Sequence, residues 1–168
     1  MIEVTIVING ETRRATVPPE TTLLVLLREQ FHLTGAKTGC DVGDCGACTV
    51  LVDGQAVNAC LMLAGQVDGR RVLTIEGLAA RENFHPLQKA FEESGALQCG
   101  FCGPGVILSA KALLDRNPQP TRPEIRDGLA GNLCRCTGYA KLVDAVEEAA
   151  RAMRRDAPAE TGRELVHG

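Results

Sequence analysis

The sequence predicts an α+β chain in which a small domain with a mixed β-sheet precedes an all-α domain. Two observations carry this prediction. Alternating apolar residues and hairpin turns fill the first half, whereas apolar residues at helical spacing dominate after Gly77. A length of 168 residues allows one large domain or two small ones. We therefore expect a sheet domain over residues 1–78, a helical domain over 79–155, and a flexible or partner-docked tail over 156–168.

The first half is interpreted as two hairpins around one helix. Asn9-Gly10 and Asp53-Gly54 are turn signals of the kind that join antiparallel strands through type I′ turns. Thr21 or Thr22 can cap a helix, which we expect to end at Gly35. The strands are expected over residues 2–8, 14–17, 49–52, 56–60 and 71–75. These elements predict a small mixed sheet with one main helix.

The second half is predicted to be a bundle of four short helices. Pro104 falls in the first turn of one of them, and Asn117-Pro118 follows its end. His85 is expected to cap or border another, and Tyr139 to pack in the core or between the domains. The helices are expected around residues 87–91, 106–114, 123–129 and 139–150.

Composition excludes several classes of function. The net charge is −3, without the basic excess that nucleic-acid binding requires. No apolar stretch approaches the roughly 20 residues of a membrane helix. The first residues, MIEVTIVING, lack a basic region followed by an apolar one, so we expect no export signal and a cytoplasmic location. Thiols stay reduced there, which favours metal ligation over disulfides for the eight cysteines.

The first cysteine group has the spacing Cys40-x4-Cys45-x2-Cys48, with Cys60 further on. This order is the plant-type ligand spacing of a [2Fe–2S] cluster. Three thiolates must come from one loop that wraps a compact anionic core. The loop's glycines, Gly39, Gly43 and Gly46, allow the backbone to curl and to point N–H groups at the sulfurs. Zinc sites favour two C-x2-C-like pairs instead.

The second group combines Cys99-x2-Cys102 with Cys134-x-Cys136. Each pair precedes an expected helix, whose positive N-terminal end would stabilise thiolate charge. On spacing alone the group could hold zinc or a [2Fe–2S] cluster. A first [2Fe–2S] cluster in the same chain favours a second cluster over zinc at this site, because two neighbouring redox centres form a path for electron transfer.

Three strings carry a family resemblance: GCDVGDCGACTV (39–50), QCGFCGPG (98–105) and GNLCRCTGY (131–139). With them, residues 2–154 resemble the iron–sulfur subunit of the molybdenum hydroxylases, the family of xanthine dehydrogenase, aldehyde oxidoreductase and bacterial carbon monoxide dehydrogenase. One departure is Gly103, where members often have Thr.

The resemblance implies a plant-type ferredoxin-like (β-grasp) domain, followed by a four-helix-bundle domain, each with a [2Fe–2S] cluster. The cluster of Cys40, Cys45, Cys48 and Cys60 would be the one farther from molybdenum. The cluster of Cys99, Cys102, Cys134 and Cys136 would lie near it. Gln98 and Cys136 would approach the pterin of a molybdenum cofactor on a large partner subunit. Electrons would leave for FAD on a medium subunit or for another acceptor.

The rest of the sequence favours a role in electron transfer over a role in catalysis. It has no GxGxxG motif after a strand, no P-loop and no paired histidines for a Rieske centre. We therefore expect the substrate chemistry to reside in cofactors and partner subunits. A free-standing two-cluster ferredoxin or redox sensor is the alternative, although such carriers are usually strongly acidic. A zinc or disulfide scaffold is a third interpretation.

Overall fold

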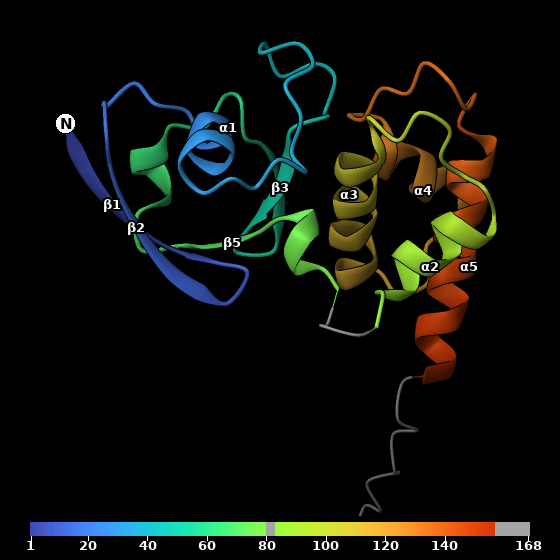
Figure 1. Cartoon of the computed structure of the whole chain (residues 1–168). Helices are drawn as coiled ribbons and strands as arrows, with labels where there is room; N and C mark the ends of the chain where they lie inside the picture. Colours follow the sequence, from blue (N-terminus) through green and yellow to red (C-terminus); the bar gives the residue numbers. More distant parts are fainter. Residues whose placement is uncertain (80–82, 157–168) are drawn as a thin grey trace, which may run out of the picture.

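The computed structural model describes residues 1–79 and 83–156. Figure 1 shows a sheet with one short helix on one side and a group of helices on the other. The sheet order is β2-β1-β5-β3-β4, with β1 and β5 parallel and the other neighbours antiparallel. The strands are β1 Ile2–Ile8, β2 Glu11–Val17, β3 Thr49–Val52, β4 Gln55–Asn58 and β5 Arg71–Leu73. The predicted mixed sheet is therefore confirmed.

Both predicted hairpins form through turns with two residues in the left-handed region. The φ angles are 52° at Asn9 and 87° at Gly10, and 49° at Asp53 and 83° at Gly54. Two successive positive φ angles match the right-handed twist of the flanking strands, which is why Asn-Gly and Asp-Gly are such strong hairpin signals.

The helix of the first half is shorter than predicted. Thr22 caps α1 (Leu23–Val25), which continues as a π-helical turn over Leu26–Gln30. The expectation that it ends at Gly35 is wrong, because His32 adopts a φ of 56° and leaves the helix. The Arg28 guanidinium then donates to the carbonyl oxygens of residues 34 and 36, at 3.0 and 2.8 Å, and holds that segment outside the helix.

Strand β3 joins the two halves of the molecule. All four of its residues are buried. Val50 and Val52 pack in the core shared with α1, whereas Leu51 points to the opposite face and packs in the core of the helices. A strand that buries both faces is typically rich in apolar residues, as Val50, Leu51 and Val52 are here.

The four predicted helices of the second half are present as α2 Pro86–Glu93, α3 Gly103–Arg116, α4 Arg122–Leu129 and α5 Ala140–Asp156. They share one apolar core, which includes Phe91, Leu108, Ile125 and Leu142. His85 caps α2 as expected, since its Nδ1 accepts a hydrogen bond from the Leu87 N–H at 3.2 Å. Apart from Asp156, the predicted tail lies outside the described residues.

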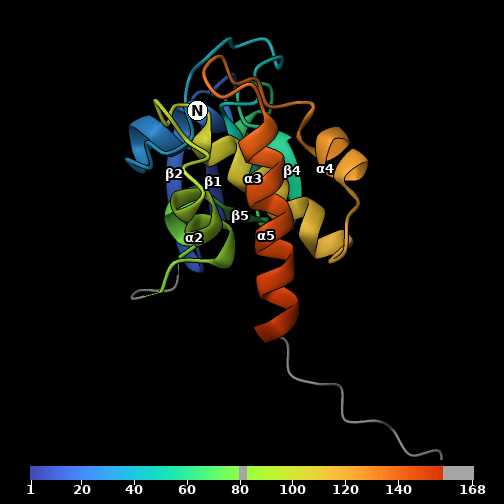
Figure 2. The same cartoon turned by 90° about the vertical axis from the view of Figure 1, so that its right-hand side faces the viewer.

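The two cysteine-rich loops lie at one end of the molecule. In Figures 1 and 2 the loop before β3 and the loop before α5 stand side by side there, next to the N-terminus of α3. This placement brings together segments more than 80 residues apart, as the hydrogen bond between residues 132 and 46 shows.

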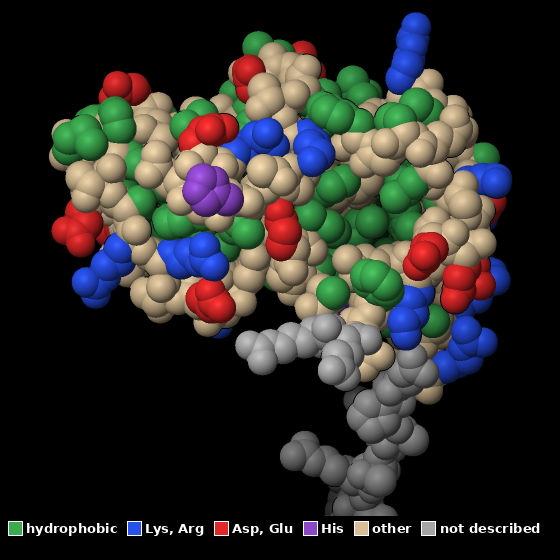
Figure 3. Space-filling view, in the orientation of Figure 1, with side chains coloured by type: hydrophobic (Ala, Val, Ile, Leu, Met, Phe, Trp, Pro, Cys, Tyr) green, Lys and Arg blue, Asp and Glu red, His purple; other side chains and the backbone are tan. Residues whose placement is uncertain are grey.

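The face in Figure 3 carries interspersed acidic and basic side chains, with apolar atoms gathered over the region between the sheet and the helices. No single-sign patch covers it, in keeping with the net charge of −3. In the described part of the chain, no helix combines the length and the apolarity that crossing a membrane would take.

Candidate metal centres

The structure brings the cysteines of the first group together. Cys40, Cys45 and Cys48 lie in the loop before β3, and Cys60 lies in the turn after β4. The thiols of Cys40 and Cys45 interact with each other, as do those of Cys48 and Cys60. Cys45 also lies within electrostatic range of Cys60, so the two pairs face one another.

Backbone N–H groups surround part of this loop. The Cys45 N–H donates to the Sγ of Cys40 at 3.4 Å. Hydrogen bonds from the backbone of Val42 and Cys45 lower the pKa of Cys40 to about 7. Burial instead raises the pKa of Cys48 to about 12. One pair therefore lies at the half-buried rim, and the other lies deeper in the protein.

The loop glycines have different roles. A Cβ on Gly39 would lie 2.7 Å from the Sγ of Cys45, so this glycine lets the thiol approach the backbone. Gly43 has a φ of 82° and turns the loop. Gly46, with a φ of 67°, faces the helical half, where a Cβ would collide with the carbonyl oxygen of Gly131. It thus allows contact between two loops, a role that the sequence did not indicate.

The second group also comes together. The sulfurs of Cys99 and Cys136 are 3.6 Å apart and both residues are exposed. The thiols of Cys102 and Cys134 interact with each other and are buried. Cys102 is the N-cap of α3, as the helix-terminus argument anticipates, but residues 137–139 separate Cys136 from α5.

Local hydrogen bonds act on the pKa of Cys134. Burial acts to raise this pKa, but the Thr137 hydroxyl and the backbone of residues 136 and 137 outweigh burial, and the pKa is lowered. The Thr137 Oγ1 lies 3.1 Å from the Cys134 Sγ. For its partner Cys102, burial raises the pKa to about 12. Of the two thiols, Cys134 therefore loses its proton more readily.

Tyr139 does not pack as expected. Its side chain is 38% exposed, and its hydroxyl accepts a hydrogen bond from the Cys134 N–H at 2.8 Å. Its backbone adopts a φ of 69°, which is uncommon for a residue other than glycine. Tyr139 is thus partly exposed, and its hydroxyl supports the cysteine loop.

The arrangement in pairs bears on the kind of metal. A tetrahedral zinc site needs four ligands around one ion, whereas a [2Fe–2S] cluster takes two thiolates on each of two irons. Two facing thiol pairs in each group fit the two-iron cluster.

Asn132 joins the two loops, and the sequence did not single it out. Its Nδ2 donates to the Gly46 carbonyl oxygen at 3.0 Å and contacts the Thr49 Oγ1 at 3.2 Å, and the residue is 4% exposed. Beside it, the Leu133 N–H donates to the Cys45 carbonyl oxygen at 2.9 Å. No local pattern marks such a residue, because its partners lie in the other half of the chain.

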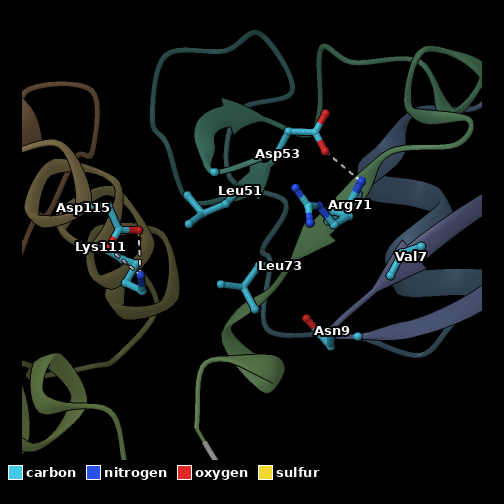
Figure 4. A pocket seen from close by; sticks show the side chains of 11 residues that line it. Val7, Asn9, Leu51, Asp53, Arg71, Leu73, Lys111 and Asp115 are labelled. Atoms are coloured by element: carbon cyan, nitrogen blue, oxygen red, sulfur yellow. Dashed lines mark hydrogen bonds and ion pairs between the residues drawn. The ribbon is translucent and has the colours of Figure 1, made fainter.

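Gln98 is exposed and directly precedes the exposed Cys99. The pocket drawn in Figure 4 is elsewhere, between α3 and the inner strands β1, β5 and β3 of the sheet, and has a volume of about 360 Å³. Arg71 and Asp53 line one side of it, and the Lys111–Asp115 ion pair on α3 lines the other. None of the eight cysteines lines this pocket.

Comparison with known proteins adds the decisive observation. Residues 6–74 match the family described as 2Fe-2S iron-sulfur cluster binding domain, and residues 74–147 match the [2Fe-2S] binding domain family. The nicotinate dehydrogenase small FeS subunit of Eubacterium barkeri is 52% identical over 148 residues, which cover 88% of this chain and 94% of that one. This chain belongs to the iron–sulfur subunits of the molybdenum hydroxylase family.

Solved structures agree with this membership. The quinoline 2-oxidoreductase from Pseudomonas putida 86 matches with a TM-score of 0.88 at 44% identity, over 92% of this chain and 97% of the matched chain. The aldehyde oxidoreductase from Desulfovibrio gigas matches with a TM-score of 0.89 at 48% identity, over 94% of this chain. The match spans only 18% of that longer chain, so the family includes members in which this unit is fused to further domains. The present chain thus carries two [2Fe–2S]-binding domains of an oxidoreductase.

Proposed function

We propose that this chain is the electron-transfer subunit of a molybdenum-cofactor hydroxylase. In this proposal it receives electrons from a molybdenum-pterin cofactor on a large subunit. It would pass them to FAD on a medium subunit or to another acceptor. The observation that carries the proposal is the direct connection of the two cysteine loops through the Leu133 N–H and the Cys45 carbonyl oxygen.

The eight cysteines are assigned to two clusters. Cys40, Cys45, Cys48 and Cys60 would hold the distal [2Fe–2S] cluster, and Cys99, Cys102, Cys134 and Cys136 would hold the one proximal to molybdenum. When bound, each cluster supplies a one-electron redox centre. Between the two groups, the path runs through the Cys45 backbone, one hydrogen bond of 2.9 Å and the peptide from Leu133 to Cys134.

The exposure of the second cysteine group indicates where a partner subunit could dock. Cys99, Cys136 and Gln98 are exposed, whereas Cys102 and Cys134 are buried. A partner can therefore reach the Cys99/Cys136 side of the second group without any opening of the fold. We propose that Gln98 and Cys136 face the pterin there, and that the distal cluster passes electrons on to the acceptor.

The finer architecture belongs to the same proposal. Residues 1–78 would form the plant-type ferredoxin-like (β-grasp) domain and residues 79–155 the four-helix-bundle domain, with a tail over 156–168. Two apolar cores, one around the sheet and one around the helices, support this division. We further propose that the chain works in the cytoplasm and does not turn over substrate by itself.

Metal analysis of the complex isolated from its source tests this function. We expect about four iron and four sulfide per copy of this chain, because each of two sites holds two of each. The chain should also co-elute in size exclusion with a molybdenum-containing large subunit. Elution alone as a brown protein of 17.9 kDa would contradict the subunit role, and zinc without iron would contradict both redox interpretations.

A further inference from the structure

The segment from Cys134 to Tyr139 is closed by hydrogen bonds of its own. The Cys134 N–H donates to the Tyr139 hydroxyl at 2.8 Å, and the Tyr139 N–H donates to the Thr137 Oγ1 at 3.3 Å. The Thr137 Oγ1 in turn lies 3.1 Å from the Cys134 Sγ. These three contacts tie the backbone, a hydroxyl and a ligand sulfur into one ring.

The ring fixes which way the Thr137 hydroxyl points. A threonine hydroxyl has one proton to donate and two lone pairs to accept with. The Tyr139 N–H already occupies a lone pair, so it approaches Oγ1 as a donor. A metal-bound Cys134 is a thiolate without a proton. The contact between Thr137 and Cys134 can then only be an O–H donation to sulfur.

Tyr139 holds this geometry in place. Its backbone is in the left-handed region, with a φ of 69°, a conformation that costs free energy and persists where the surroundings over-determine it. The hydrogen bond from the Cys134 N–H to the phenol oxygen of Tyr139 crosses the loop and supplies that constraint. The Thr137 hydroxyl is thus pre-positioned against the sulfur.

No other cysteine in the described ranges has such a donor. The Cys40 Sγ accepts from a backbone N–H, at 3.4 Å. The Cys136 sulfur interacts with the backbone of Cys99 and with its sulfur, the latter at 3.6 Å. Thr137 is therefore the one side-chain hydroxyl, among residues 1–79 and 83–156, that donates to a cysteine sulfur.

We propose that Thr137 is a positioning residue that raises the reduction potential of the cluster held by Cys99, Cys102, Cys134 and Cys136. This inference rests on the proposed function. A hydrogen bond to a ligand sulfur stabilises the electron-rich reduced cluster more than the oxidised one. The bond would make the second cluster a better acceptor for electrons arriving at the exposed Cys99/Cys136 side.

A redox titration of the intact complex, followed by EPR, tests the proposal. The comparison uses the wild type, Thr137→Val, which keeps the shape without the hydroxyl, and Thr137→Ser, which keeps the hydroxyl. We expect Thr137→Val to make the second cluster about tenfold harder to reduce at a fixed potential, which for one electron is a shift of about 59 mV. In Thr137→Ser the potential should stay close to that of the wild type, and the potential of the first cluster should not change in either variant.

Each outcome decides the matter. An unchanged potential in Thr137→Val, with both signals present, would overturn the proposal while leaving the electron-transfer role intact. If Thr137→Val loses the second signal, the potential is measured in Thr137→Ala, whose smaller side chain also has no hydroxyl. Loss of the second signal in Thr137→Ala as well would show that Thr137 acts in cluster assembly, which also overturns the proposal. Absence of both signals in the wild type would instead contradict the proposed function itself.

Discussion

Asn132 shows most clearly how one side chain connects the two metal-binding loops. Its amide is buried and bonded to the Gly46 carbonyl oxygen and the Thr49 hydroxyl. Asn132→Ala would remove both hydrogen bonds, while the Gly46 carbonyl oxygen would still accept from the N–H and the hydroxyl of Thr49. We expect a loss of about 1–3 kcal/mol in unfolding free energy, which is the usual net contribution of two hydrogen bonds.

Chemical denaturation followed by the visible absorbance of the clusters measures this loss. Asn83→Ala is the matched control, because Asn83 is exposed. The control should stay within about 0.5 kcal/mol of the wild type. Equal stability of the two variants would show that Asn132 does not tie the loops together.

The sequence indicated the cysteines, but not the residues that contact the cysteine loops in the folded chain. Spacing alone predicted which four cysteines form each group, because ligands of one cluster recur at fixed intervals. Asn132 and Thr137 escaped notice because their roles depend on where a distant carbonyl or a folded loop places an acceptor. Tyr139 was assigned to packing because an aromatic residue at helical spacing is usually apolar core.

Among the elements, α3 is the one that carries the second group against the first. Gly105 lies in its first turn, and a Cβ there would collide with the carbonyl oxygen of Gly46. Gly105→Ala must push the helix away from the loop of Cys45. We expect a destabilisation of about 1–3 kcal/mol, as for overpacking in a core, together with faster loss of cluster colour in denaturant.

Gly131→Ala is the control for this substitution. Nothing lies within 4 Å of a Cβ at Gly131, so this variant should behave like the wild type. If Gly105→Ala were as stable as Gly131→Ala, the close contact of α3 with the first loop would not exist in solution.

Turn and cap chemistry made most of the elements predictable. Asn-Gly, Asp-Gly and prolines in first turns act locally, so the hairpins and the starts of α2, α3 and α4 follow from the sequence. The early end of the first helix did not follow. It depends on Arg28 bonding to the carbonyl oxygens of residues 34 and 36, a tertiary effect that periodicity does not reveal.

In the whole molecule, each proposed cluster has its own four cysteines, although hydrogen bonds join the two cysteine loops. Loss of one cluster should therefore leave the other in place. Cys45→Ser removes one ligand of the first cluster. The backbone carbonyl oxygen at position 45 remains and can still accept the hydrogen bond from the Leu133 N–H. The second loop should therefore stay in place. EPR of the reduced variant should lose one signal and keep the other, and loss of both with the fold retained would contradict separate sites.

The proposed electron path requires two [2Fe–2S] clusters in series in this chain. EPR of the fully reduced wild-type complex, with spin counting, tests this requirement. We expect two distinct rhombic signals of about one spin each per copy of this chain. The two signals should also broaden each other, since hydrogen bonds to the carbonyl oxygens of Cys45 and Gly46 join the two loops directly. One signal alone, or two signals without mutual broadening, would contradict this arrangement.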